Sequence, residues 1–210
     1  MNEDLKKFLI GGSMGEGYLK QKGAYGTNLE IKLSKYTPNV PYTKENSARI
    51  EHIKSRITKA RIAGFGGWKE YVPSDSKKLK EYEQNLSKSN KEKFYECCRV
   101  GKERFITWYV ENYYEKEEKT TCCYCGVTEQ NCADFFKSHR TKRDSRGLHL
   151  EIERKDSQSN LYEKENCALA CYICNNAKSD FISEADFREY VVPGIQKFWK
   201  SKREDKGNCK

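Results

Sequence analysis

Apolar and polar residues alternate along this 210-residue chain with periods that predict both helices and strands. Leu29, Ile31 and Leu33 occupy every second position, a spacing typical of a half-buried strand. Isoleucines three or four positions apart in residues 44–62 predict an amphipathic helix whose other faces carry Lys and Arg. The glycines of segment 64–67 predict the end of this helix.

The second half of the chain also mixes the two periods. Aromatic residues at helical spacing predict a helix with a buried face over residues 103–114, and residues 148–154 are predicted to form a strand. Ser183 and Asp186 have the spacing of a capping box, which predicts the start of a C-terminal helix. Residues 74–93, rich in Lys, Ser and Glu, fit either a solvated helix or a linker. Together these elements predict an α+β fold.

The distribution of charge suggests two domains, which we place at residues 1–89 and 90–210. Residues 1–90 hold 17 Lys and Arg against 10 Asp and Glu, a balance of +7, and the rest hold 23 against 21, or +2, which gives the net charge of +9. A basic balance favours polyanions such as DNA or RNA, although charge can also serve solubility alone. We expect a small basic α/β domain that binds DNA, followed by a larger domain.

Nothing in the sequence predicts a membrane segment. No apolar run approaches the roughly 20 residues that a transmembrane helix needs. The first apolar stretch is short for a secretion signal, and acidic residues occur early. We therefore expect an intracellular, cytoplasmic protein without a membrane partner, and in that reducing compartment ten cysteines indicate metal binding rather than disulfides.

Two Cys-x-x-Cys knuckles, Cys122–Cys125 and Cys171–Cys174, are separated by 45 residues. Two intervening residues let a tight turn direct both sulfurs of a pair at one point, and four thiolates form a closed, structural Zn²⁺ site. Cys123 would replace Cys122 only with poorer spacing. The remaining cysteines are expected to be core or surface thiols, with a second metal on Cys97 or Cys98 and Cys132 as an alternative; they are Cys97, Cys98, Cys132, Cys167 and Cys209.

Three further motifs follow in order within residues 104–185. The stretch LEIER at 150–154 is a short strand that ends in an acidic residue, Asn166 lies in ENCALAC, and Asn175 directly follows a knuckle cysteine. In this order the segment resembles the HNH, or ββα-metal, endonucleases. The resemblance is closest to those members in which Arg follows the acidic residue, among them a rare-cutting restriction enzyme. It implies a zinc-bound ββα-metal domain with flanking helices over residues 90–210.

The resemblance assigns a role to each of these residues. Glu153 and Asn175 are implied to bind a catalytic Mg²⁺ or Mn²⁺, ions that prefer oxygen ligands and that can neutralise the leaving oxygen of a phosphodiester. Arg154 is implied to bind the scissile phosphate, which a guanidinium can clamp at two points. Asn166 is expected to be structural and to tie a loop back to the strand.

Arg154 also marks a departure from most of the family, which has a His general base at this position. Arg cannot accept a proton near neutral pH, so another group activates the water, or catalysis is slower, or the site is degenerate. The candidates are His149, His139 in the loop SHRTKR, and Tyr162. His149 lies five positions before Arg154, which places it on the opposite face of the strand.

The sequence therefore predicts an endonuclease that hydrolyses double-stranded DNA in a restriction or homing context. A cut in both strands of a palindrome would require a homodimer. The rival hypothesis is a non-catalytic, zinc-dependent nucleic-acid-binding protein. The segment FLIGGSMGEGYL is also similar to the LAGLIDADG homing enzymes, which would make Glu16 a second metal ligand. The residues expected to contact DNA are Lys142, Arg143, Arg146 and Lys178.

Overall fold

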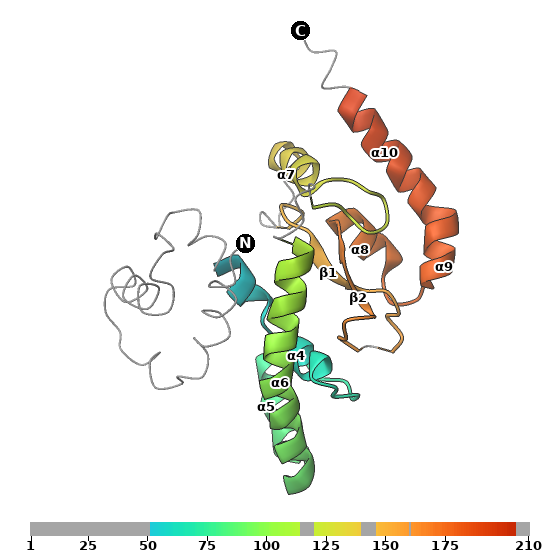
Figure 1. Ribbon diagram of the computed structural model, residues 1–210. Helices are drawn as coiled ribbons and strands as arrows, with labels where there is room; N and C mark the ends of the chain where they lie inside the picture. Colours follow the sequence, from blue (N-terminus) through green and yellow to red (C-terminus); the bar gives the residue numbers. More distant parts are fainter. Residues whose placement is uncertain (1–50, 114–119, 140–145, 160, 205–210) are drawn as a thin grey trace, which may run out of the picture. The chain divides into compact units, whose positions relative to one another are not determined.

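The computed structural model describes residues 51–113, 120–139, 146–159 and 161–204 (Figure 1). Contacts divide the chain into two compact units, Met1–Glu111 and Asn112–Lys210. The domain boundary that we expect near residue 89 coincides with the start of a long helix that begins at Lys88. The boundary stays a prediction. The strand predicted around residues 29–33, and with it the α/β character of the first domain, lies outside the described residues, as does Glu16.

The described part of the first unit consists of helices and turns. A helical segment at residues 51–56 precedes α4 (Lys59–Phe65), α5 (Ser76–Asn85) and α6 (Lys88–Tyr113). One continuous helix through residue 62 was a wrong prediction, because Thr58 adopts an extended conformation and its side chain caps α4 by accepting from the Arg61 N–H. Asp75 caps α5 in the same way, so residues 74–93 are mostly helical rather than a linker.

Glycine allows two backbones of the first unit to meet. A Cβ at Gly101 would lie 1.7 Å from the Ile62 carbonyl oxygen, and one at Gly66 would lie 1.9 Å from the Cys97 carbonyl oxygen. Only glycine can occupy positions in such close contact. The described part of the unit contains a buried hydrophobic cluster whose buried members are Ala63, Trp68, Val72 and Phe94. Within it the Trp68 Nε1–H donates to the Tyr82 hydroxyl at 2.9 Å.

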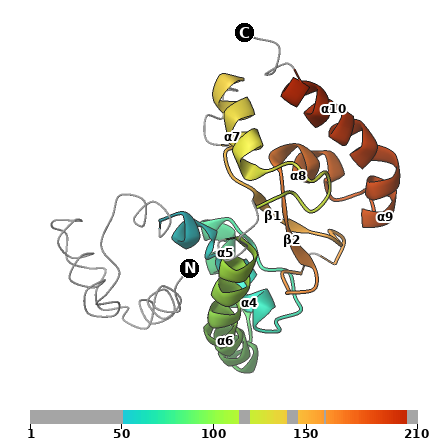
Figure 2. The same ribbon diagram turned by 45° about the horizontal axis from the view of Figure 1, so that its top comes forward.

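The second unit is organised around a two-stranded antiparallel sheet and the helix that follows it. Strand β1 (Glu151–Arg154) pairs with β2 (Cys167–Ala170), with Glu151 opposite Ala170 and Arg154 opposite Cys167. Helix α8 (Tyr172–Lys178) begins directly after β2 and packs against β1, as Figures 1 and 2 both show. The expected order of two strands and a helix is therefore present, with a strand shorter than the predicted 148–154.

Helices on either side of this core complete the second unit (Figure 2). Helix α7 (Glu129–Ser138) precedes the sheet, and α9 (Glu184–Asp186), η1 (Phe187–Val191) and α10 (Val192–Glu204) follow α8. The Ser183 side chain accepts from the Asp186 N–H, as the capping-box spacing predicts. The π-helical turn η1 was not predicted; it lies just before Pro193, which has no N–H for the regular helical hydrogen bond.

Candidate metal centre and catalytic site

The first cysteine knuckle is a tight turn joined to the sheet. The Cys122 N–H donates to the Val127 carbonyl at 2.9 Å, and the Gly126 N–H donates back to the Cys122 carbonyl at 3.0 Å. Gly126 has a φ of 72°, in the left-handed region where glycine is unstrained. The Cys123 N–H reaches the Leu169 carbonyl of β2 at 2.9 Å, so the knuckle is anchored beside the second cysteine pair.

The second knuckle is the start of α8. Cys171 is the N-cap residue of this helix, and its sulfur accepts from the Cys174 N–H at 3.4 Å. Because the two residues are three positions apart across the first helical turn, their sulfurs face the same side. Asn175 follows within the same turn, and its N–H donates to the Cys171 carbonyl at 2.9 Å.

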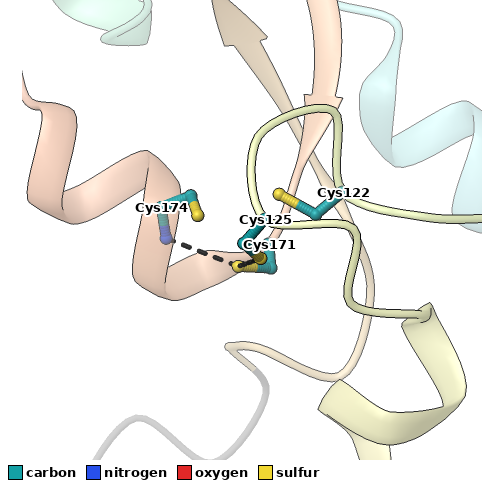
Figure 3. A group of neighbouring side chains, drawn as sticks. All are labelled: Cys122, Cys125, Cys171 and Cys174. Carbon is teal, nitrogen blue, oxygen red and sulfur yellow. Dashed lines mark hydrogen bonds between the residues drawn. The ribbon is translucent and has the colours of Figure 1, made fainter. Parts of the chain in front are cut away.

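The four knuckle sulfurs converge on one point (Figure 3). All four cysteines are buried, and their sulfurs lie within 4.8 Å of one another, with 3.8 Å between those of Cys125 and Cys171. Zinc bound to four thiolates at about 2.3 Å would separate the sulfurs by about 3.8 Å. The cluster therefore fits the predicted structural Zn²⁺, and among the residues described it is the one group of three or more Cys, His, Asp or Glu ligands.

The cysteines of the cluster differ in their pKa values. The pKa of Cys122 is lowered because its neighbours, Cys123 first, donate hydrogen bonds to its sulfur. The pKa of Cys174 is raised because its own proton is held by Cys122 and because the thiol is buried. Metal binding requires cysteines as thiolates, so a divalent cation held by these four sulfurs would displace their protons.

The other cysteines have surroundings that match their predicted roles as thiols. Cys132 and Cys167 are buried in the second unit, and Cys97 and Cys98 are partly buried beside the core of the first. Every described cysteine is free of disulfides. Burial raises the pKa of Cys98 to about 12, which makes this thiol a poor nucleophile at neutral pH. Cys209 lies outside the described residues.

Glu153 and Lys178 form a buried ion pair between β1 and α8. The ammonium lies 3.2 Å from Glu153 Oε1, and the side chains are 0% and 6% exposed for Lys178 and Glu153. Lys178 also donates to the Arg154 carbonyl at 3.2 Å and to the Ser157 hydroxyl at 2.8 Å. Burial raises the pKa of Glu153, an effect that Lys178 and Arg154 partly offset. The expectation that Lys178 contacts DNA was wrong, since this lysine is enclosed by protein.

A second pair lies beside the first on the same two elements. The Asn175 amide nitrogen donates to Glu151 Oε2, and Glu151 also binds the Arg146 guanidinium at 3.0 Å through Oε1. Glu151 and Glu153 are two positions apart on β1, so their side chains lie on the same face of the strand. Asn175 and Lys178 are three positions apart on α8, so they lie on the same face of the helix. Glu151 was not predicted as a site residue, although its alternation with Glu153 along the strand was a signal that could have identified it.

Arg154 extends from the end of β1 toward the loop that follows. Its guanidinium lies 5.0 Å from the centre of the Tyr162 ring and 3.9 Å from an Asp180 carboxylate oxygen. The side chain retains 20% exposure. Two of the predicted catalytic residues, Arg154 and Tyr162, are therefore in contact. Arg154 directly follows Glu153 in the sequence.

Asn166 ties together the loop between the strands. Its side-chain oxygen accepts from the Asp156 N–H at 2.7 Å, and its amide nitrogen donates to the Leu161 carbonyl at 2.9 Å and the Asp156 carbonyl at 3.0 Å. Its main-chain carbonyl accepts from the Lys155 N–H, directly after β1. Asn166 therefore bridges the loop, as its predicted structural role requires. An effect of Asn166 on the geometry of a metal site stays a prediction.

The two histidines proposed as bases, His149 and His139, both contact residues of α7. His149 Nδ1 lies 3.2 Å from both Glu129 Oε1 and the Tyr113 hydroxyl. His139 follows α7, and its ring stacks on Phe135 with centroids 4.2 Å apart. Neither contact brings an imidazole toward Arg154, so their assignment as general bases stays a prediction without geometric support.

Comparisons with known proteins returned a similar solved structure. No family model matches the chain, and no curated protein matches it. The chain is similar to a structure of the rare-cutting HNH restriction endonuclease PacI, with 29% sequence identity and a TM-score of 0.39. The match covers 48% of this chain and 65% of PacI, so this chain spans less than two thirds of that protein's length.

Proposed function

We propose that this protein is a metal-dependent DNA endonuclease of the HNH type. The observation that carries the proposal is the contact between β1 and α8, which the four-cysteine cluster anchors at the start of α8. In this contact two acidic residues of β1 face an asparagine and a lysine of α8, in the order of the HNH motifs found in the sequence.

The donor set on this interface suits a hard divalent cation. Glu153 offers a carboxylate whose Oε1 is held by Lys178, and Asn175 offers an amide oxygen from the first turn of α8. Both are oxygen ligands, as Mg²⁺ and Mn²⁺ require. When bound, such an ion would polarise the phosphate and neutralise the leaving oxygen.

Arg154 and Tyr162 supply the remaining groups of the proposed site. The Arg154 guanidinium is partly exposed and would bind a non-bridging phosphate oxygen at two points. Tyr162 lies against it and is the base candidate that the geometry favours over His139 and His149. Tyrosine is among the side chains that can serve as a general base, and here its phenol oxygen would take the proton of the attacking water.

The substrate we propose is double-stranded DNA. The net charge of +9 attracts a polyanion, and most of this charge belongs to the first 90 residues. Arg146 is engaged by Glu151 and by the Tyr172 ring, so a DNA contact by this residue would compete with these partners. Restriction and homing are both compatible contexts, and a double-strand cut at a palindrome would need two copies of the chain.

The test is cleavage of supercoiled plasmid by the full-length, zinc-loaded chain with Mg²⁺ or Mn²⁺. We expect nicked or linear product from the unmodified protein. The rate of Asn175→Ala should be lower by about 100-fold or more, because even the loss of a residue that only supports a metal ligand costs about 10- to 100-fold. The matched control is Asn176→Ala, because Asn176 is the exposed neighbour whose side chain donates to the Tyr172 carbonyl of its own helix. Equal rates from the two variants would remove Asn175 from the mechanism.

One observation favours the non-catalytic alternative, a zinc-dependent nucleic-acid-binding protein. Both proposed metal ligands already have protein partners, Lys178 for Glu153 and Glu151 for Asn175. A protein of this kind would retard DNA in a gel without cleaving it in any divalent metal. Retardation that persists with EDTA, together with intact plasmid after long incubation in Mn²⁺, would establish the alternative.

A further inference from the structure

The interface of β1 and α8 contains a carboxylate that the proposed mechanism does not use. Glu151 is partly buried, with a side chain 14% exposed, and both of its oxygens have hydrogen-bond donors. Arg146 reaches Oε1 at 3.0 Å and Oε2 at 3.2 Å through the same nitrogen, and the Asn175 amide also donates to Oε2. A carboxylate occupied in this way is poorly placed to bind a metal itself.

The Glu151 carboxylate fixes which end of the Asn175 amide faces it. An ionised carboxylate only accepts hydrogen bonds, so the group that contacts it must be the amide nitrogen and not the oxygen. The amide is planar, and its oxygen therefore points away from Glu151. Without this contact the amide could rotate by half a turn, which would present an N–H to a cation.

Glu151 is itself held in place from two sides. The β1–β2 pairing opposite Ala170 fixes its backbone, and Arg146 packs its guanidinium 4.7 Å from the centre of the Tyr172 ring on the first turn of α8. Arg146 also compensates the negative charge of Glu151, so the carboxylate is stabilised without a metal. A rigid acceptor of this kind restricts its partner to one orientation.

We infer that Glu151 is a positioning residue, which orients the Asn175 amide so that its oxygen is available to the catalytic metal. This inference rests on the proposed function, and it adds a residue that orients one of the two proposed metal ligands. Residues that orient a metal ligand in other proteins change metal affinity by about 10- to 100-fold when they are replaced. Glu151 should have an effect of this size although it does not touch the ion.

The experiment measures Mn²⁺ affinity of the full-length, zinc-loaded protein without DNA, by electron paramagnetic resonance of free Mn²⁺. Glu151→Ala removes the acceptor, and we expect its dissociation constant for Mn²⁺ to rise by about 10- to 100-fold. Glu151→Gln removes the charge but keeps a carbonyl that can accept from Asn175, and its affinity should stay within about threefold of the unmodified protein. The control Glu189→Ala removes one exposed carboxylate of η1 and should change nothing.

Zinc content and thermal unfolding of each variant separate a folding defect from a loss of orientation. In ¹⁵N-labelled protein, the side-chain amide resonance of Asn175 should move in Glu151→Ala and move less in Glu151→Gln. Equal Mn²⁺ affinity in all folded variants would overturn the inference alone. An equal loss in Glu151→Gln and Glu151→Ala would also overturn it, because Glu151 would then act through its charge. Absence of Mn²⁺ binding by the unmodified protein would instead overturn the proposed function, and the inference with it.

Discussion

Replacement of Lys178 by Met should destabilise the second unit severely, because the buried Glu153 carboxylate would then lack its cationic partner. Met has a similar length and no charge, so the main change is the loss of the cation 3.2 Å from Glu153 Oε1. Removing one member of a buried ion pair costs about 3–5 kcal/mol, since the remaining charge is buried without compensation. That is a large part of the roughly 5–15 kcal/mol by which a domain is stable.

The destabilisation should grow as pH rises. The pKa of Glu153 is already raised by burial, and Lys178→Met removes the main interaction that offsets this burial. A carboxyl group whose folded-state pKa is raised binds more protons when folded, so its contribution to stability is present at low pH and is lost as pH rises through that pKa. The difference between variant and unmodified protein should thus be small near pH 4 and full at pH 8.

Urea unfolding of the zinc-loaded chain, followed by circular dichroism between pH 4 and pH 8, measures this difference. The double variant Lys178→Met with Glu153→Leu serves as the control, because it replaces the pair with apolar side chains and should recover most of the lost stability. A loss under about 1 kcal/mol at pH 8, or one that does not change with pH, would refute the reasoning. It would mean that Glu153 reaches water or finds another partner in the variant.

Four other changes test different parts of the second unit. Removal of zinc by a strong chelator should unfold α8 with loss of helical circular dichroism, because structural zinc contributes about 10–16 kcal/mol to such sites; an unchanged spectrum would contradict a structural metal. Gly147→Ala should cost about 1–3 kcal/mol in urea unfolding, since Gly147 has a φ of 85° and its Cβ would lie 2.4 Å from the Phe136 ring; a neutral effect would disagree with that conformation. Asn166→Ala leaves buried loop groups without partners and should cost about 1–3 kcal/mol in the same assay, more than Asn176→Ala. Burial opposes ionisation of Glu129, but hydrogen bonds from His149, Tyr113 and the Leu150 N–H outweigh it and lower the pKa of Glu129. Its contribution to stability should therefore be lost as pH falls from the usual glutamate pKa of about 4.3 through the lowered folded-state value. Glu129→Gln should flatten that acid limb of the stability profile, and an unaltered limb would count against this reasoning.

The sequence contained enough information for the elements that depend on local patterns. The knuckle spacing predicted that four sulfurs from distant segments meet, and the four-cysteine cluster agrees with it. The Ser183 cap followed from a three-residue spacing, and the LEIER stretch correctly located the centre of β1. Each of these signals lies within a few residues or reflects a fixed ligand chemistry.

The features that were missed depend on contacts between distant residues. Lysine is usually a surface residue, and nothing near Lys178 in the sequence reveals that Glu153 and the loop around Ser157 enclose it. The same holds for the partnership of Glu151 with Asn175, which are 24 positions apart. The interruption at Thr58 was overlooked for a different reason, because an apolar stripe of the right period concealed a residue that prefers to cap a helix.

Cys171 is both the N-cap of α8 and a member of the sulfur cluster. A helix of seven residues has little intrinsic stability, so its first turn depends on whatever fixes that cap. A metal ion on Cys171 and Cys174 would therefore act as the nucleation point of the segment that carries Asn175 and Lys178. The cellular supply of zinc would then decide whether the contact between β1 and α8 forms at all, and withdrawal of the ion would dismantle it without any inhibitor binding to the protein.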